Sequence, residues 1–364
     1  MTTKLLFEPV TAGNLKLANR IVMAPMTRAF SPDGVPGDDV AAYYRRRAEG
    51  GVGLIVTEGT AINHPSAVSS PRIPNFHGEA ALKGWAKVAA EVHEAGGKII
   101  PQLWHVGLER PIGALPNPEA LPVGPSGLNL AGEQVTEPLT TAEIEGLVAA
   151  FAQAAADAKA AGFDGIELHG AHGYLIDQFF WERTNKRTDR YGGDLVGRTT
   201  FAVEVIEACR RAVGPDFPIV LRFSQWKAGN YSAKLVDTPE ELERFLAPLV
   251  QAGVDIFHCS TRRFWLPEFE GSELNLAGWT KKITGKPTIT VGSVGLDSDF
   301  LIPDKEKSDE DNLERLLERL DREEFDLVAV GRALISDPAW PNKVQEGRTD
   351  EILPYTQQST STLY

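Results

Sequence analysis

Cysteine is scarce in this sequence: Cys209 and Cys259 are the only two among 364 residues. Two cysteines are too few for a disulfide framework, an iron–sulfur cluster or a zinc site with four cysteine ligands. Basic residues are outnumbered as well, because 37 Lys and Arg stand against 50 Asp and Glu, and the formal net charge is −13. An acidic surface repels nucleic acids and anionic lipids at long range, so we expect no nucleic-acid partner.

Long apolar runs are missing too. The N-terminal residues MTTKLLFEPV contain no apolar core long enough for a secretion signal. The most apolar helical stretch, 142–161, contains Glu143, Glu145, Asp157 and Lys159, which argues against a transmembrane helix. We therefore expect a cytoplasmic protein without membrane contact.

Eight short apolar runs are present, most of them rich in Val, Ile or Leu. Runs of this length are typical of parallel strands that are buried on both faces. The predicted strands are 21–24, 53–56, 98–103, 165–168, 219–223, 255–258, 288–291 and 326–330.

Amphipathic helical patterns separate most of these runs. In one of them, Thr140 and Glu143 form a predicted capping box, and Gly162 is predicted to end the helix. Strands that alternate with helices predict an α/β fold, either a closed barrel or an open doubly wound sheet. The strand count, the length and the lack of a GxGxxG after the first strand favour a (β/α)8 TIM barrel that spans 1–364 as one domain.

Two connections are expected to be long loops. The stretch 106–140 is rich in Pro and Gly and follows the third strand, and 259–285 follows the sixth. Long loops at the carboxyl ends of barrel strands commonly form substrate pockets. We expect Phe264 and Trp265, in the second loop, to cover the substrate.

His169, His172 and Tyr174 follow the fourth predicted strand, at the end of a barrel where catalytic residues lie. The His-x-x-His pair alone fits two structural histidines or two zinc ligands, with His105 or His258 as a third, so a metal-dependent barrel hydrolase is the alternative. The added tyrosine suggests different chemistry. Two imidazoles can donate hydrogen bonds to one carbonyl or nitro oxygen, and the phenol can then protonate the neighbouring carbon.

Small and basic residues follow the last two predicted strands. Gly292 and Ser293 come after the seventh, and Gly331 and Arg332 come after the eighth. Barrels often bind a phosphate with these two loops, where glycines admit backbone N–H groups and an arginine can pair with the anion. Two tight turns would also fit, but the Gly-Arg pair favours a phosphate site.

Five motifs, in the same order, resemble those of the Old Yellow Enzyme family. They are NRIVMAPMTR (19–28), PQLWH (101–105), HGAHGYLIDQF with NKRTDRYGG (169–193), VGSVG (291–295) and VGRALISDP (330–338). The resemblance spans nearly the whole chain. It implies an FMN-dependent ene-reductase in which NADPH or NADH donates the hydride, with small electrophilic alkenes as substrates and a monomeric or homodimeric state.

The resemblance also implies roles for individual residues. Thr27 would bind the flavin O4, Gln102 the pyrimidine edge, and Arg222 would place positive charge near N1 and O2. The implied cofactor-binding residues are Ala24, Pro25, Met26, Thr27, Gln102, Arg222, Val291, Gly292, Ser293, Gly331 and Arg332. The implied substrate-binding residues are His169, His172, Tyr174 and Trp104, with Tyr174 as the proton donor.

The sequence departs from the family pattern at three positions. Leu108 stands where relatives often have Arg, and Arg110 follows two residues later. His172 stands where many members have Asn, although both side chains donate hydrogen bonds. Thr27, rather than Cys, occupies the expected flavin edge, which resembles the classical branch of the family rather than the thermophilic-like one. A larger relative of the dienoyl-CoA reductase kind would need an iron–sulfur site, and a non-enzymatic flavin-binding protein would not need so many polar groups at strand ends.

Overall fold

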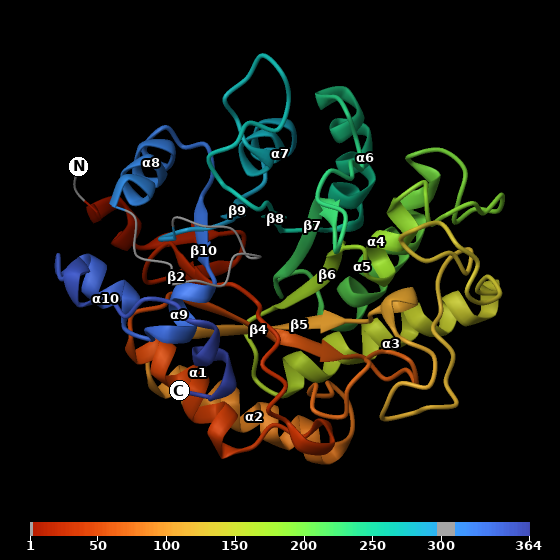
Figure 1. Ribbon diagram of the computed structural model, residues 1–364, viewed down its shortest axis with the longest axis horizontal. Coiled ribbons are helices and arrows are strands. Elements are labelled where there is room, and N and C mark those ends of the chain that lie inside the picture. Colours follow the sequence, from red (N-terminus) through yellow and green to blue (C-terminus); the bar gives the residue numbers. More distant parts are fainter. Residues whose placement is uncertain (1–2, 297–309) are drawn as a thin grey trace.

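A closed barrel of eight parallel strands forms the centre of the computed structural model, which describes residues 3–296 and 310–364. The strands follow the order β10-β3-β4-β5-β6-β7-β8-β9 around the ring, and helices surround them (Figure 1). Every predicted strand overlaps one of the observed strands, so the predicted (β/α)8 barrel is confirmed. The strands are β3 (Ile21–Met23), β4 (Leu54–Ala61), β5 (Lys98–Trp104), β6 (Ile166–His172), β7 (Ile219–Lys227), β8 (Ile256–Ser260), β9 (Thr288–Val291) and β10 (Leu327–Val330).

Three strands continue four or five residues beyond their predicted ends, and β5 and β8 continue by one and two residues. The additional residues 57–61 of β4, 169–172 of β6 and 224–227 of β7 are mostly polar. The backbone ladder nevertheless persists there, with Gly59 opposite Gln102 and His172 opposite Lys227. An apolar run stops where polar side chains begin. The sequence pattern therefore underestimates the length of these strands at the carboxyl end of the barrel.

Helices cover the outside of the barrel and bury their apolar faces against it. The predicted capping box of α3 is confirmed, since Glu143 Oε2 accepts the Thr140 N–H at 2.7 Å. No helix in 3–296 or 310–364 combines the length and the apolar character needed to span a bilayer. The helices are α1 (Asp38–Glu49), α2 (Glu79–Glu94), α3 (Thr141–Ala160), α4 (Leu175–Phe180), α5 (Thr200–Val213), α6 (Pro239–Ala252), α7 (Leu276–Thr284), α8 (Glu310–Asp321), α9 (Arg332–Ser336) and α10 (Trp340–Gln345).

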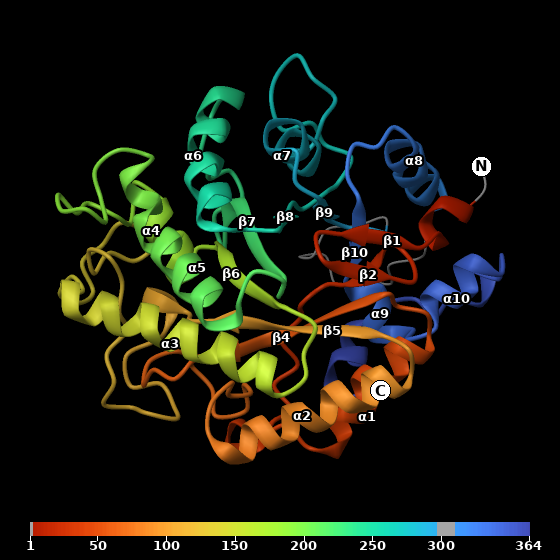
Figure 2. The ribbon, with the colours of Figure 1, turned by 180° about the vertical axis from the view of Figure 1, so that it is seen from behind.

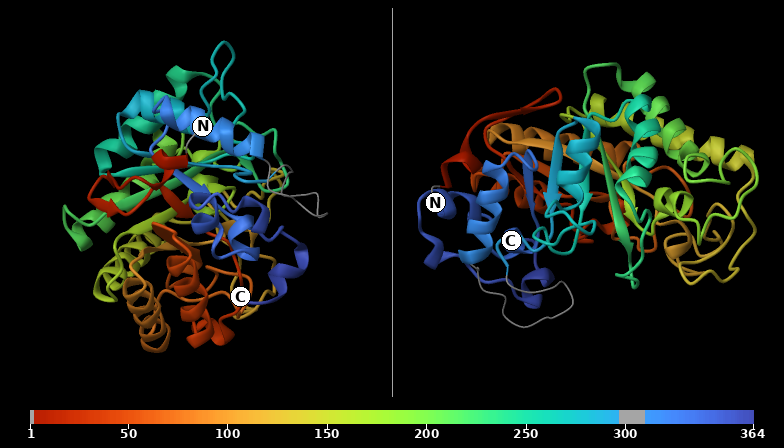
Figure 3. Two further views of the ribbon diagram at one scale, coloured as in Figure 1. Left: turned by 90° about the vertical axis from the view of Figure 1, so that its left-hand side faces the viewer. Right: turned by 90° about the horizontal axis from the view of Figure 1, so that it is seen from above.

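A two-stranded hairpin, absent from the sequence prediction, closes the amino-terminal end of the barrel. Strands β1 (Val10–Ala12) and β2 (Leu15–Leu17) pair antiparallel, and Gly13 adopts a positive φ of 55° in the turn. The hairpin packs its buried apolar residues onto the barrel's interior core, which includes Val22 and Leu54. Figure 2 shows the hairpin in front of the barrel, and Figure 3 shows it at the opposite end from the long connections. Strands of three residues are too short for an alternation pattern to reveal.

The two long connections differ from each other. Residues 106–140 are irregular apart from a short 3-10 turn at Gly107–Glu109, as predicted. The prediction of a loop over 259–285 is wrong at both ends, because β8 reaches Ser260 and α7 begins at Leu276. Asn275 caps α7 by accepting the Gly278 N–H at 2.9 Å. The connection therefore contains the helix that an α/β barrel requires at this position.

Candidate active site

A cavity of about 780 Å³ lies at the carboxyl ends of the barrel strands. This volume is within the range of cofactor and substrate pockets, about 300–1,000 Å³. All fifteen residues predicted to bind the cofactor or the substrate line it. They are Ala24, Pro25, Met26, Thr27, Gln102, Trp104, His169, His172, Tyr174, Arg222, Val291, Gly292, Ser293, Gly331 and Arg332.

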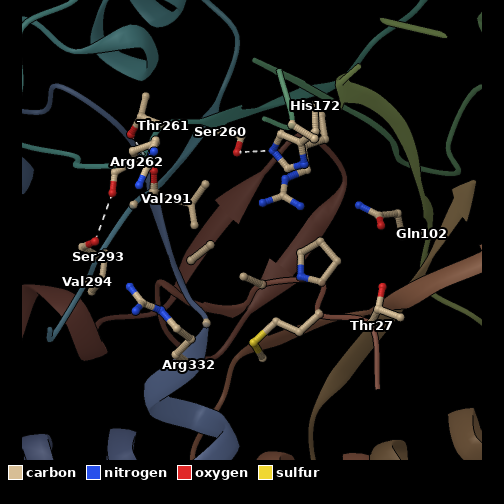
Figure 4. A pocket seen from close by; sticks show the side chains of 18 of the residues that line it. Thr27, Gln102, His172, Ser260, Thr261, Arg262, Val291, Ser293, Val294 and Arg332 are labelled. Atoms are coloured by element: carbon tan, nitrogen blue, oxygen red, sulfur yellow. Dashed lines mark hydrogen bonds between the residues drawn. The ribbon is translucent and has the colours of Figure 1, made fainter. Parts of the chain in front are cut away.

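Figure 4 shows how these side chains divide the cavity. Thr27 and Gln102 lie on one side of the cavity, and Arg332 and Ser293 lie on the other side. His172 lies at one end. The side chains come from separate barrel strands and their following loops, so the closed barrel is what brings residues from all parts of the chain together.

His169 is a neutral hydrogen-bond donor. It is 5% exposed, and its Nδ1 accepts the backbone N–H of Ala171 at 3.3 Å, which leaves the proton of the neutral ring on Nε2. Burial lowers its pKa well below the ordinary value, and the positive charge of Arg222 and the proximity of His258 lower it further. The ring therefore presents an N–H without carrying a charge.

His172 is held in a strained conformation at the end of β6. Its φ is +64°, in the left-handed region that non-glycine residues rarely occupy, beside a shift in the β6–β7 register. Its ring stacks on Trp226 at 4.2 Å, and its Nε2 lies 2.7 Å from Ser260 Oγ. Burial and the charge of Arg222 lower its pKa well below the ordinary value. The sequence prediction missed Trp226 and Ser260, which fix this ring.

Tyr174 stands at the N-cap position of α4, with its ring edge-on to Trp104 and His169 at 4.9 and 5.0 Å. Burial raises its pKa above the ordinary value of 10.0, and Glu109 adds to this effect. The phenol consequently keeps its proton at neutral pH and is able to donate it.

A buried ion pair supports the turn that carries Tyr174. Asp177 Oδ2 accepts the Gly173 N–H at 2.7 Å, and its Oδ1 lies 2.8 Å from Lys227 Nζ. Both charged side chains are 0% exposed. Because a buried charge requires a partner, the pair links the end of β7 to the loop after β6 and restrains the tyrosine.

Arg222 carries a buried guanidinium whose Nε has no hydrogen-bond partner in the described residues. The side chain is 7% exposed and lines the cavity. Burial lowers its pKa, while Glu167 opposes that shift, and an arginine remains protonated in proteins. Within 3–296 and 310–364, Trp104 Nε1 is a second buried donor without a partner. Since buried donors in proteins are nearly always satisfied, both point to a ligand with acceptor atoms.

Gln102 belongs to a buried polar chain. Its Nε2 donates to Glu167 Oε1 at 2.8 Å, and Glu167 Oε2 lies 2.7 Å from His258 Nδ1. This chain fixes the amide orientation, because the NH₂ group must face the carboxylate. The carbonyl oxygen of the Gln102 side chain is thus left as the group that can accept from a ligand.

The predicted phosphate side consists of the loops after β9 and β10. Gly292 and Ser293 have positive φ of 147° and 52°, and a Cβ on Gly292 would lie 2.7 Å from the Thr261 carbonyl oxygen. A Cβ on Gly331 would be in ordinary van der Waals contact with Met26 Sδ at 3.5 Å and Ala24 Cβ at 3.9 Å. The guanidinium of Arg332 lies 5.7 Å from the ring of Tyr355.

Residues near the rim of the cavity escaped prediction. Arg262 lies over the Tyr231 ring at 3.6 Å, and both line the cavity. The expectation that Phe264 and Trp265 cover the substrate is wrong, because Phe264 is fully buried and neither is among the lining residues. Phe264 turns inward because its backbone N–H donates to Gly292 O at 3.1 Å, which draws the loop against β9.

A further wall of the cavity comes from the segment 352–364. Tyr355, Gln357 and Thr360 line the cavity, although they follow the last barrel strand by more than twenty residues. They belong to no apolar run or motif, so the sequence offered no signal for their position.

Arg110 lies outside the cavity. It is 1% exposed, and its guanidinium donates to the carbonyl oxygens of Val68, Ala120 and Asn117 at 2.8–2.9 Å. Arg110 therefore organises the irregular connection 106–140. It does not take the place of the arginine that relatives often have at position 108.

The alternative in which the histidines of the site bind a metal ion is not favoured by their surroundings. Within 3–296 and 310–364, no group of three or more His, Cys, Asp or Glu side chains could hold an ion. His105 bonds through its Nε2 to His64 Nδ1 at 2.9 Å, so it is engaged with that ring. His258 is engaged with Glu167, as described above.

Residues 5–351 match the model of the NADH:flavin oxidoreductase / NADH oxidase family. Morphinone reductase in complex with tetrahydroNAD has a TM-score of 0.80 at 31% identity, with 98% of this chain and 93% of that chain covered. An Old Yellow Enzyme homologue from Zymomonas mobilis has a TM-score of 0.79 at 27% identity, with 98% and 96% covered. The chain belongs to the Old Yellow Enzyme family.

Relatives of known sequence differ in length. A chanoclavine-I aldehyde reductase of Penicillium roqueforti is 33% identical over 374 residues, which cover 99% of this chain and 92% of that protein. An NADH oxidase of Thermoanaerobacter brockii is 36% identical over 359 residues, which cover 95% of this chain and 52% of that protein. The chain thus spans about half the length of that NADH oxidase.

Membership in the family implies a flavin, and the cavity fits one. The unpartnered Arg222 guanidinium suits the electron-rich edge of a flavin ring, and the Gln102 amide can pair with a pyrimidine-like edge. The backbone of Gly331 and the side chain of Arg332, which both line the cavity, suit a phosphate. Thr27 lines the same cavity on the side of Gln102.

Proposed function

We propose that the protein is an FMN-dependent ene-reductase that uses NADPH or NADH to reduce activated C=C bonds. The substrate class is α,β-unsaturated carbonyl and nitro compounds, with nitro groups and nitrate esters as further acceptors. The observation that carries the proposal is one cavity that joins two neutral imidazoles, a protonated phenol and an unpartnered buried guanidinium. FMN supplies the hydride chemistry: the nicotinamide reduces it, and it reduces the alkene.

The side chains of this chain do the rest. His169 and His172 donate hydrogen bonds to the activating oxygen of the substrate, which draws electrons from the double bond and stabilises the negative charge that develops on that oxygen. Tyr174 protonates the α-carbon, and the edge-on contact with Trp104 holds its ring. Arg222, Gln102, Thr27 and the loops with Gly331 and Arg332 hold the cofactor.

The proposal predicts a ping-pong order of reaction. With FMN bound, the cavity of about 780 Å³ would leave one place for both the nicotinamide and the alkene. The oxidised nicotinamide must leave before the alkene enters, so double-reciprocal plots should be parallel.

The decisive experiment is the visible spectrum of the purified protein after incubation with FMN. We expect a flavin spectrum that bleaches when NADPH or NADH is added without oxygen and returns when 2-cyclohexenone is added. A protein that remains colourless after reconstitution would contradict the cofactor assignment. A yellow protein that bleaches but does not recover with any alkene would contradict the substrate class alone.

A further inference from the structure

Residues Thr57–Thr60 of β4 contact Gln102 and the backbone immediately after Thr27, on one side of the cavity, without lining it. The β4–β5 register shifts between Val56 and Gly59, so this stretch bulges from the ladder. Its side chains are buried, yet none of the four residues is among those that line the cavity. Residues 57–60 can therefore affect a bound molecule only through the residues that line the cavity.

Glu58 bonds to the backbone immediately after Thr27. The carboxylate is 1% exposed, and its Oε2 accepts two consecutive N–H groups, from Arg28 at 2.9 Å and from Ala29 at 3.0 Å. Ala29 has a φ of +58°, a left-handed conformation that costs free energy for a non-glycine residue. The converging bonds from one carboxylate oxygen stabilise this conformation and thus the path of the loop that carries Thr27.

The two threonines of the stretch bracket Gln102 in the same way. The Gln102 N–H donates to Thr57 Oγ1 at 3.1 Å, and Thr60 Oγ1 donates to the Gln102 carbonyl at 2.7 Å. Gly59 between them has no side chain, and a Cβ there would lie 2.4 Å from the Trp104 ring. Figure 4 shows Thr27 and Gln102 on the same side of the cavity, and one stretch of β4 bonds to Gln102 and to the backbone next to Thr27.

We propose that Glu58 is a positioning residue that holds Thr27 at the flavin through the backbone of Arg28 and Ala29. The inference rests on the proposed FMN site. Glu58 itself stays behind the loop, where its own N–H donates to Tyr44 Oη at 2.8 Å, so the strand and α1 fix its place. FMN affinity should therefore depend on the acceptor strength of this side chain, and only as long as Thr27 is present.

The test measures the FMN dissociation constant by flavin fluorescence for a graded pair of variants. The measurements are made at pH 9, because burial raises the pKa of Glu58 to about 7 and the side chain is ionised well above that value. Glu58→Gln keeps an acceptor oxygen without the charge, which weakens the two bonds, and Glu58→Leu removes the acceptor. We expect affinity to fall in that order, to about tenfold weaker for the leucine, which is the effect of about one hydrogen bond. In a Thr27→Ala background, the same two changes should have no further effect, because a chain of contacts gives non-additive losses.

Glu324→Gln and Glu324→Leu are the matched controls. Glu324 is also a buried carboxylate, 8% exposed and 3.0 Å from Arg319, but it does not line the cavity. These variants should leave FMN affinity unchanged. If Glu58→Leu does not fold, Glu58→Gln with and without Thr27→Ala still completes a double-mutant cycle for the two positions.

Two outcomes would overturn the positioning role. One is wild-type FMN affinity in both Glu58 variants, and the other is losses of equal size with and without Thr27, which would indicate general destabilisation. Failure of the wild-type protein to bind FMN would instead contradict the proposed function, so the two failures are distinguishable.

Discussion

Tyr174 is a residue whose surroundings preserve its proton. Burial and the proximity of Glu109 raise its pKa, so the phenol is fully protonated across the neutral range. We expect Tyr174→Phe to slow reoxidation of the reduced enzyme by an alkene by about a hundredfold or more, the usual contribution of a general acid. Flavin reduction by NADPH or NADH needs no such proton and should keep its rate.

Rapid mixing of each half-reaction measures both rates separately. Tyr231→Phe is the matched control, because it removes another phenol that lines the same cavity. Equal slowing of the two half-reactions by Tyr174→Phe would show that the tyrosine shapes the site and does not deliver the proton.

The two imidazoles set the pH range of alkene reduction. Burial and the charge of Arg222 lower the pKa values of His169 and His172 well below the ordinary 6.5. As pH falls from 8 through 6.5, both rings therefore stay neutral, and the rate of reoxidation should stay level. It should decline only when pH reaches the lowered values. A rate profile with a midpoint near 6.5 would contradict this environment.

The same shifts affect stability in a defined direction. A histidine with a lowered pKa in the folded state contributes stability above the unfolded pKa of about 6.5, and this contribution is lost as pH falls through the folded value. Glu58 acts oppositely: burial raises its pKa to about 7, so its contribution is present below the unfolded pKa and lost as pH rises through 7.

Residue types and motifs predicted the central residues that line the cavity, but neither its rim nor the contacts that hold these residues in place. His169, His172 and Tyr174 lie within six positions of one another, so one strand end places them together. Ser260 and Trp226, which fix the His172 ring, are 88 and 54 positions away from it. Ordinary serine and tryptophan residues carry no signal of that contact until the barrel closes.

At the scale of elements, the pattern of apolar residues predicts strands reliably where both faces of the strand are buried. The apolar runs locate all eight strands, because parallel strands are covered on both faces. The pattern fails where the strands become polar, at the ends of β4, β6 and β7, and it cannot detect the three-residue strands of the hairpin. The functional end of the barrel is thus the part that periodicity describes least well.

The capping box of α3 provides a prediction at this scale. The Thr140 side chain accepts the Glu143 N–H at 3.3 Å, and the Glu143 carboxylate accepts the Thr140 N–H. Thr140→Ala removes one of these bonds from the start of a 20-residue helix and should lower the free energy of unfolding by about 1 kcal/mol. Urea titration measures the loss. Thr141→Ala, one position further on and equally exposed, should change stability little, and equal losses would contradict the capping role.

At the scale of the whole molecule, one wall of the cavity depends on contacts between the two ends of the sequence. Arg28, just after β3, donates through its Nη2 to the carbonyl oxygens of Thr362 at 2.7 Å and Thr360 at 3.2 Å. Arg46 of α1 donates to the Leu363 carbonyl and lies 5.2 Å from the Tyr364 ring. The segment 352–364 is therefore held against the barrel by arginines that lie more than 300 positions earlier.

Arg28→Ala should release this wall. Without the guanidinium, the carbonyl oxygens of residues 360 and 362 lose charged donors, and the segment that carries Thr360 should open more often. We expect amide hydrogen exchange in 357–363 to accelerate at least about tenfold, the ratio that corresponds to about 1.4 kcal/mol of local stability. Arg72→Ala is the control, because Arg72 donates to Ala29 O in the same loop at 2.8 Å and its guanidinium lies over the Phe30 ring at 5.6 Å. If Arg28→Ala exchanges like the wild type, the bond between Ser336 and Ser359 hydroxyls and the Arg46 contacts are enough to hold the wall, and Arg28 is not its main restraint.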